Sequence, residues 1–269
     1  MKNLFKSTFA LLSLLAVTFN ANSQELVSKK GFPILPEAKD WSISFDAVPF
    51  LDYAFDKTRV LSSTPATSAT GALDYSVANT LVGKVMKDAN TAYRGKVQFG
   101  FGSTTKDSFV PKTGSTTGET VTNKEKESST NITLGGGMQY YRGKGRLRGY
   151  YGYEGLIGLS TGPNKTMTYG NALDAFSEGS RTTEEKSGMG FNLGARGFVG
   201  AEYFFAPKMS VGAEFGWGLG FGMTGEGETT SESFDGTSVK STTVKTGGDS
   251  SFGAGVDNAG GSINLSIYF

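Results

Sequence analysis

The chain has 269 residues, and its 26 Lys and Arg balance 25 Asp and Glu to a formal net charge of +1, so charge gives no reason to expect nucleic-acid binding. It contains no Cys, which excludes disulfides, thiol chemistry and a lipid anchor on cysteine. It contains no His either, which removes the commonest general base and metal ligand, and we expect neither a cofactor nor a metal.

Residues 1–23 are predicted to be a cleaved secretory signal peptide. Lys2 and Lys6 give a basic start, residues 9–19 are apolar, and small residues follow just before Gln24. The apolar run is shorter than the ~20 residues that a membrane-spanning helix needs. We therefore expect export from the cytoplasm rather than a helical anchor.

The next segment, 24–40, contains two prolines and is predicted to be a short periplasmic lead-in to a single β domain at 41–269. From residue 41 onward apolar and polar residues alternate with the period of two that is typical of strands with two different faces. Eight such segments are predicted, near residues 41–47, 77–86, 93–101, 131–140, 147–159, 191–205, 209–219 and 262–269.

The connections between these segments alternate in length. Short turns are predicted at 87–90, 143–145 and 206–207, and long loops at 54–75, 105–129, 161–187 and 224–256. The loops are rich in Thr, Ser, Gly, Lys and Glu, a composition typical of solvated, flexible chain. Asp235-Gly236 in the last loop indicates a hairpin turn, and with it an outward continuation of the flanking strands. Strict alternation of short and long connections favours an all-β fold: an eight-stranded antiparallel transmembrane β-barrel, an up-and-down meander with short periplasmic turns and long extracellular loops.

Several segments carry a resemblance to a known family. Residues 31–36 leading into 40–51, and residues 190–203 followed by 210–217, are similar to small outer-membrane β-barrel proteins of Gram-negative bacteria of the OmpA/OmpX type. The final strand, closed by Tyr268 and Phe269, resembles the C-terminal assembly signal of such barrels. The resemblance implies location in the cell outer membrane, contact with outer-membrane lipid, and the barrel-assembly machinery as a partner during insertion. Such folds host many activities, so it does not imply one.

The polar faces of the strands carry charges. They are Asp46, Arg94, Lys96, Arg148, Glu154, Arg196, Glu202 and Glu214, with Lys84 as a further cation if its strand has the expected register. An eight-stranded barrel has an interior only wide enough for side chains, where charges must pair. These residues are therefore interpreted as a salt-bridged plug. Two alternatives are a narrow hydrated conduit and, less in keeping with their spread along the strands, a catalytic carboxylate pair.

The opposite faces carry aromatic residues near the strand ends. They are Trp41, Tyr53, Tyr93, Tyr140, Tyr153, Tyr203, Phe205, Trp217 and Phe269. This placement is typical of the aromatic girdles at the two membrane interfaces, with a ligand-binding stripe as the alternative.

Two motifs resemble catalytic or phosphate-binding signatures without their context. Ser103 and Lys106 with Lys112-Thr-Gly114 match fragments of a penicillin-binding serine enzyme, but no Ser-Asp-Asn accompanies them and no helix is expected there. The glycines of 216–222 lack the Lys and the following helix of a phosphate-binding loop. No enzymatic activity is expected.

The sequence thus predicts a non-enzymatic outer-membrane protein, an envelope component or a surface-interaction scaffold that contacts an unknown extracellular ligand through its loops. The alternative is a narrow porin-like channel for ions or small solutes. A scaffold would lose partner binding when loops 161–187 or 224–256 are shortened, whereas a channel would respond to neutralisation of the interior charges.

Overall fold

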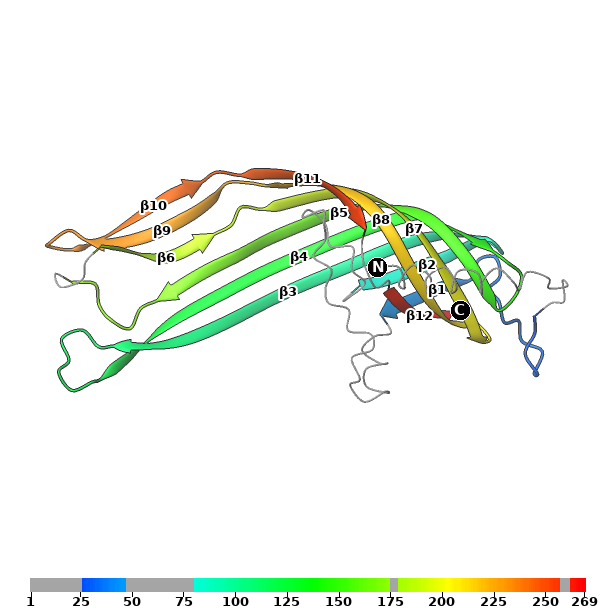
Figure 1. Cartoon of the computed structure of the whole chain (residues 1–269), viewed down its shortest axis with the longest axis horizontal. Helices are drawn as coiled ribbons and strands as arrows, with labels where there is room; N and C mark the ends of the chain where they lie inside the picture. The colour runs from blue at the N-terminus through cyan, green and yellow to red at the C-terminus, as the bar shows by residue number, and fades with distance from the viewer. Residues whose placement is uncertain (1–25, 47–79, 175–178, 257–261) are drawn as a thin grey trace, which may run out of the picture.

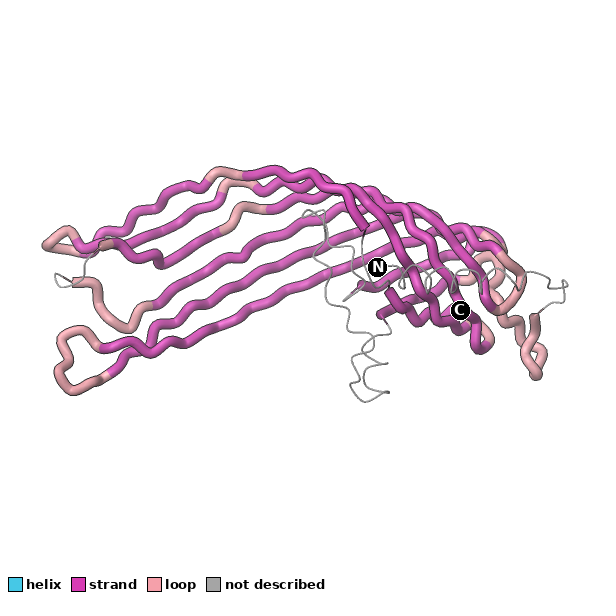
Figure 2. Tube along the Cα trace, viewed as in Figure 1, coloured by secondary structure: helices cyan, strands magenta, loops and turns pink. Residues whose placement is uncertain are grey.

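The computed structural model describes residues 26–46, 80–174, 179–256 and 262–269. The predicted signal peptide, the predicted loop at 54–75 and Tyr53 lie outside these ranges. Most of the described chain is β-strand (Figure 2). Within it, no helix is long and apolar enough to cross a membrane.

The described strands form one antiparallel sheet. They are β1 (Trp41–Asp46), β2 (Thr80–Asp88), β3 (Thr91–Pro111), β4 (Thr120–Arg142), β5 (Leu147–Thr168), β6 (Ser180–Lys186), β7 (Gly190–Ala206), β8 (Met209–Thr224), β9 (Gly227–Phe234), β10 (Val239–Thr246), β11 (Asp249–Val256) and β12 (Ser262–Tyr268). Hydrogen-bonded ladders join β1, β2, β3, β4, β5, β7, β8 and β12 in that order, and β12 pairs back onto β1. The all-β, antiparallel prediction is confirmed, and the pairing closes a ring of eight strands.

Side chains on the ring strands alternate between the inside and the outside of the ring. In β2 every second residue from Thr80 to Met86 is buried, and the residues between them are exposed. β3 follows the same rule from Ala92 to Gln98 and then stops alternating. The outward positions on these stretches are large and apolar, such as Leu81 and Val85 on β2 and Val97 and Phe99 on β3. The ring is therefore polar inside and apolar outside.

Three ring strands continue far beyond the ring. β3, β4 and β5 are 21, 23 and 22 residues long, and β3 pairs with β4 without interruption from Thr91 opposite Tyr140 to Pro111 opposite Thr120. The prediction of long loops at 105–129 and 161–187 is therefore wrong for most of the first and part of the second. Where both faces of a strand are exposed to solvent, the sequence no longer alternates between apolar and polar residues. The backbone hydrogen bonds that hold the ladder do not depend on that alternation.

The extensions join additional strands into what we call the far sheet, ordered β10-β9-β6-β5-β4-β3. In Figure 1 it runs to the left from the ring as a long curved blade. β9 and β10 form a hairpin, and the Asp235 amide donates to the Ser238 carbonyl in its turn, as the Asp-Gly signal predicted. The predicted loop at 224–256 is otherwise wrong, because it consists mainly of β9, β10 and β11, and β11 pairs with β8.

The opposite end of the ring, which we call the short-turn end, carries the tight links between β2 and β3, β4 and β5, and β7 and β8. The lead-in segment closes this end. Its Ile34 is 1% exposed and packs with Met86, Ala92, Tyr141 and Phe204 from four ring strands. Backbone bonds fix the segment in place: the Lys208 amide donates to the Ile34 carbonyl and the Lys39 amide to the Met86 carbonyl. These apolar side chains, which we call the apolar plug, thus close the short-turn end of the ring next to the charged interior.

Candidate functional site: the charged interior of the ring

The structure brings most of the predicted interior charges together inside the ring. Arg94, Lys96, Arg148, Glu154, Arg196, Glu202 and Glu214 are all buried, and so is Lys84. Each lies at an inward position of the alternation, which is why sequence periodicity could assign them. The side chain of Asp46 lies outside the described part of the chain, although its backbone ends β1.

The part of the interior farther from the short-turn end contains a network of five charged side chains. The guanidinium of Arg94 donates to both carboxylate oxygens of Glu214 (2.6 and 3.1 Å), and its Nε lies 3.2 Å from Glu154 Oε2. Arg196 Nη1 bridges the same two carboxylates, at 3.0 Å from Glu154 and 2.8 Å from Glu214. Lys96 Nζ approaches Glu154 at 3.8 Å. Two glutamates on β5 and β8 therefore share three cations on β3 and β7, and the bidentate geometry restricts how the ring can deform.

A second cluster lies closer to the short-turn end and is centred on Glu202. Lys84 Nζ donates to both of its oxygens at 3.2 Å, and the hydroxyls of Tyr141 and Tyr268 each donate at 2.8 Å. Ser210 Oγ donates as well. A buried carboxylate is thus fully provided with donors, which offsets the cost of removing it from water.

Arg148 is buried with these residues but bonds elsewhere. Its Nη2 donates to the carbonyl of Ala89 and to Asn90 Oδ1, both at 2.8 Å, and its guanidinium lies 4.7 Å from the ring centroid of Tyr141. The alternation placed it inside correctly, but its position next to the short-turn end directs it to the β2–β3 turn. It anchors that turn and does not join the salt bridges.

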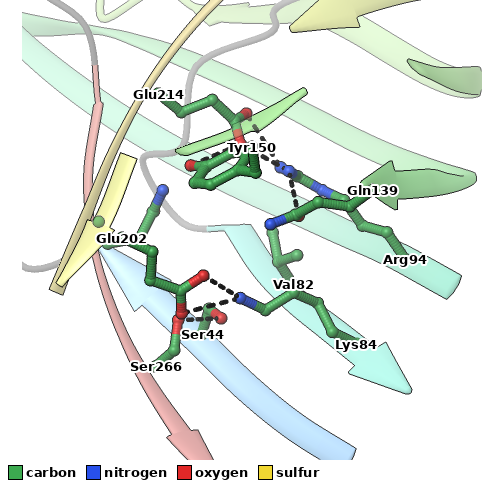
Figure 3. Close-up of a pocket in the computed structure, with 11 residues that line it drawn as sticks. Ser44, Val82, Lys84, Arg94, Gln139, Tyr150, Glu202, Glu214 and Ser266 are labelled. Carbon is green, nitrogen blue, oxygen red and sulfur yellow. Dashed lines mark hydrogen bonds and ion pairs between the residues drawn. The ribbon is translucent and has the colours of Figure 1, made fainter. Parts of the chain in front are cut away.

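Little space remains between the two clusters. They are separated by a cavity of about 20 Å³, whose lining includes Lys84, Arg94, Glu202 and Glu214 (Figure 3). That volume is about what a single water molecule requires. At this level side chains of the described residues occupy most of the interior.

Glycines create the room for the aromatic part of this filling. A Cβ on Gly152 would meet the ring of Phe198 and the carbonyl of Met138, and one on Gly200 would meet Tyr150. Tyr150 in turn donates a hydrogen bond to Glu214 at 3.2 Å. Neither Tyr141 nor Tyr150 was predicted from the sequence as part of the interior site, although both lie at inward positions of the alternation on their strands.

The predicted outward aromatics lie on the outer surface. Trp41, Tyr93, Tyr153, Tyr203, Phe205, Trp217 and Phe269 are exposed, and Tyr140 is partly exposed. Trp41 and Phe269 stack at 4.5 Å between ring centroids, and the backbones of the two residues exchange hydrogen bonds where β1 meets the end of β12. The C-terminal aromatic thus helps to close the ring.

Among the described residues, no group of three or more His, Cys, Asp or Glu side chains could hold a metal ion. The penicillin-binding-type motif near Ser103 lies on the exposed extension of β3, and the glycines of 216–222 lie on β8 within the ring ladder. Neither forms a pocket with the interior charges. What the site provides is a closed set of ion pairs and tyrosine hydrogen bonds that ties opposite walls of the ring together.

Comparisons with known proteins add little to this geometry. No protein-family model matches the chain, and no curated protein matches it. Among solved structures, the chain is similar to the outer membrane protein OprG from Pseudomonas aeruginosa, at 10% identity and a TM-score of 0.30, over 88% of this chain and 98% of that one. A TM-score this low supports no conclusion, so the architecture rests on the strand ladders.

Proposed function

We propose that this chain is an integral outer-membrane β-barrel protein that acts, without enzymatic activity, as a surface-interaction scaffold of the cell envelope. The observation that carries the proposal is that the ring has the reverse of the usual arrangement of polar and apolar residues in a soluble protein. Eight charged side chains are buried inside it, and large apolar side chains are exposed on its outside. Large apolar side chains are exposed on the outside of β1, β2, β3, β4, β5, β7 and β8, and Phe269 is exposed directly after β12. An outer surface of this kind is stable against lipid and unfavourable against water.

The height of the apolar band supports the same proposal. On β3 the outward apolar residues run from Tyr93 to Phe101, and on β5 from Leu147 to Leu159. A tilted membrane strand needs about 9–11 residues to cross the hydrocarbon core. Apart from a few apolar residues such as Phe109 on β3, the strands are polar beyond these positions, as expected where they leave the membrane.

The far sheet is the part proposed to act outside the cell. The short-turn end, where the lead-in segment and the end of β12 lie, faces the periplasm in this arrangement, and the far sheet projects outward. Where β5, β6, β9 and β10 meet the ring, a hollow of about 320 Å³ is lined by Lys165, Glu185, Lys186 and Glu228 among others. Its size is that of a small-molecule or side-chain binding site. The small cavity of about 20 Å³ among the described residues of the charge clusters favours the scaffold over the alternative, a porin-like channel.

The location is tested by cysteine labelling, which is clean because the chain has no Cys of its own. Ser241→Cys places a thiol on exposed β10, and Lys144→Cys places one in the β4–β5 turn. In intact cells a membrane-impermeant maleimide should label S241C and not K144C. After the outer membrane is permeabilised, the maleimide should label both variants. Labelling of K144C alone would reverse the orientation, and failure of both to co-fractionate with outer membranes would refute the location.

The scaffold role is tested by removing the β9–β10 hairpin. Gly227 and Thr246 are paired across the ladder, so replacing 228–245 with a two-residue turn leaves the ring residues untouched. The shortened protein should insert with unchanged unfolding but lose adhesion of cells to the surface or matrix they otherwise bind. Unchanged adhesion in a correctly inserted variant would contradict a role for this part of the far sheet.

A further inference from the structure

The outside of the β4–β5 hairpin at the short-turn end carries an ordered group of aromatic and basic residues, which we call the tyrosine–arginine cluster: Met138, Tyr140, Arg142, Tyr151 and Tyr153. The rings of Tyr140 and Tyr151 stack at 5.4 Å, and that of Tyr153 lies 6.4 Å from Tyr140. The hydroxyls of Tyr140 and Tyr153 both point at Met138 Sδ, at 3.5 and 3.4 Å. The cluster is thus a continuous outward surface on two adjacent strands.

Arg142 ends this surface on the side of the turn. Its guanidinium lies 5.6 Å from the ring centroid of Tyr151, and its Nη2 donates to the Tyr151 hydroxyl at 3.1 Å. Those contacts fix the orientation of the guanidinium and use only part of its five donors. Among the described residues no carboxylate lies within ion-pair distance of Arg142, nor of Lys144 in the adjoining turn.

The charge around the cluster is unbalanced. Residues 26–40, 87–90, 142–146 and 206–208, which make up the short-turn end, contain eight Lys or Arg and three Asp or Glu. The described residues of the far sheet and its links, in 102–130, 161–189 and 224–256, contain nine basic and twelve acidic residues. A chain with a net charge of +1 therefore concentrates positive charge at one end. Positive charge next to a lipid-facing aromatic surface attracts anionic headgroups.

We propose that the tyrosine–arginine cluster, with Lys144, binds the phosphate headgroup of an anionic phospholipid in the leaflet at the short-turn end. The acyl chains would lie along Tyr153 and Tyr140, and the phosphate oxygens would accept hydrogen bonds from the free guanidinium donors of Arg142 and from the Lys144 ammonium. Planar guanidinium groups match phosphate geometry, and tyrosines favour the interface between headgroups and hydrocarbon. This assignment rests on the proposed membrane location and adds a lipid class to it.

The test uses tryptophan quenching by brominated lipid. The chain has two Trp, so W41F/W217F/Y93W carries a single reporter on β3, opposite Met138 and next to the cluster without belonging to it. W41F keeps native Trp217 on β8 as a reporter away from the cluster. The protein is refolded into vesicles of one composition, phosphatidylcholine with a minority of phosphatidylglycerol. In one set of vesicles the phosphatidylglycerol is brominated. In the other set an equal fraction of the lipid is brominated, but as phosphatidylcholine.

At the Y93W reporter, brominated phosphatidylglycerol should quench at least about three-fold more than brominated phosphatidylcholine, and the ratio should fall as salt is raised. Adding R142Q/K144Q should bring the ratio to about one, whereas the matched pair K240Q/K245Q on exposed β10 should leave it unchanged. Trp217 should show a ratio near one in every case.

Equal quenching by the two lipids at Y93W, or a preference that survives R142Q/K144Q, would overturn the lipid site while leaving the membrane location intact. Absence of quenching by either lipid at both reporters would instead refute the membrane location. The two failures are therefore distinguishable in one experiment.

Discussion

The ring and the far sheet share strands but follow different physical rules. Along β3, residues from Ala92 to Gln98 alternate between buried and exposed, whereas those from Phe101 to Phe109 are exposed on both faces. The backbone ladder to β4 continues unchanged across that boundary. In the ring, stability depends on whether each side chain faces the polar interior or the apolar outer surface. In the far sheet it depends mainly on the ladder and on exposed polar pairs, so equivalent substitutions should have very different costs in the two regions.

The largest difference is expected for carboxylates. Glu202→Gln removes the counter-charge of buried Lys84 and should lower the free energy of unfolding by about 3–5 kcal/mol. In the far sheet, Glu232 pairs with Arg181 at 2.6 Å, but both side chains are more than a fifth exposed, so Glu232→Gln should cost at most about 1 kcal/mol. Urea unfolding in lipid vesicles, followed by tryptophan fluorescence, measures both. Similar losses for the two variants would remove the distinction between the regions.

The apolar plug of the ring should rank next. Ile34→Ala leaves a cavity among the residues that close the short-turn end and should cost about 3 kcal/mol. Phe32→Ala, two residues away and 60% exposed, is the matched control and should change stability little. If both variants unfold at the wild-type urea concentration, the lead-in segment does not stabilise the ring.

Crowding inside the ring gives a smaller effect. Gly152→Ala places a methyl group against Phe198 and the carbonyl of Met138 and should cost about 2 kcal/mol. At Gly95 on β3 no atom lies within 4 Å of the place that a Cβ would take, so Gly95→Ala should be close to neutral. The same unfolding experiment ranks the two, and an equal cost would mean that packing around Phe198 is looser than the structure shows.

The smallest effect is local to the far sheet. The Lys240 ammonium and the amides of Ser238 and Thr237 lower the pKa of Asp235 from 3.8 to about 2. A lowered pKa means that the carboxylate stabilises the β9–β10 turn above pH 3.8 and loses that contribution as the pH falls through about 2. Hydrogen exchange of the Ser238 amide, corrected for its intrinsic pH dependence, should lose protection over that interval. Asp235→Asn should abolish the pH dependence; protection that stays constant in the wild type would show that the carboxylate does not hold the turn.

The part of the site that sequence could predict is the part governed by alternation. Lys84, Arg94 and Glu214 could be placed inside because their neighbours on each strand are apolar and face outward, a pattern that only a two-faced strand produces. What they contact could not be predicted. Arg94 lies 120 positions from Glu214 in the sequence, and only the ring closure brings them to 2.6 Å.

The part of the fold that sequence missed lacks that alternation. β9, β10 and the extensions of β3 and β4 are rich in Thr and Ser and have no continuous apolar face, so their composition resembles that of flexible loops. The Asp235-Gly236 turn was the one local signal there. Ile34 was missed for a different reason. Ile34 and Leu35 are two adjacent apolar residues between prolines and show no periodicity, and the burial of Ile34 arises from the strands that pack around it.

The most direct test of the closed, charge-filled interior is single-channel conductance of the refolded protein in a planar bilayer. We expect no discrete conductance from protein shown to be folded, because the side chains of Lys84, Arg94, Glu202 and Glu214 leave only a cavity of about 20 Å³ between them. Reproducible current steps that change with Arg196→Gln or Glu214→Gln would contradict it and make the ring a narrow pore.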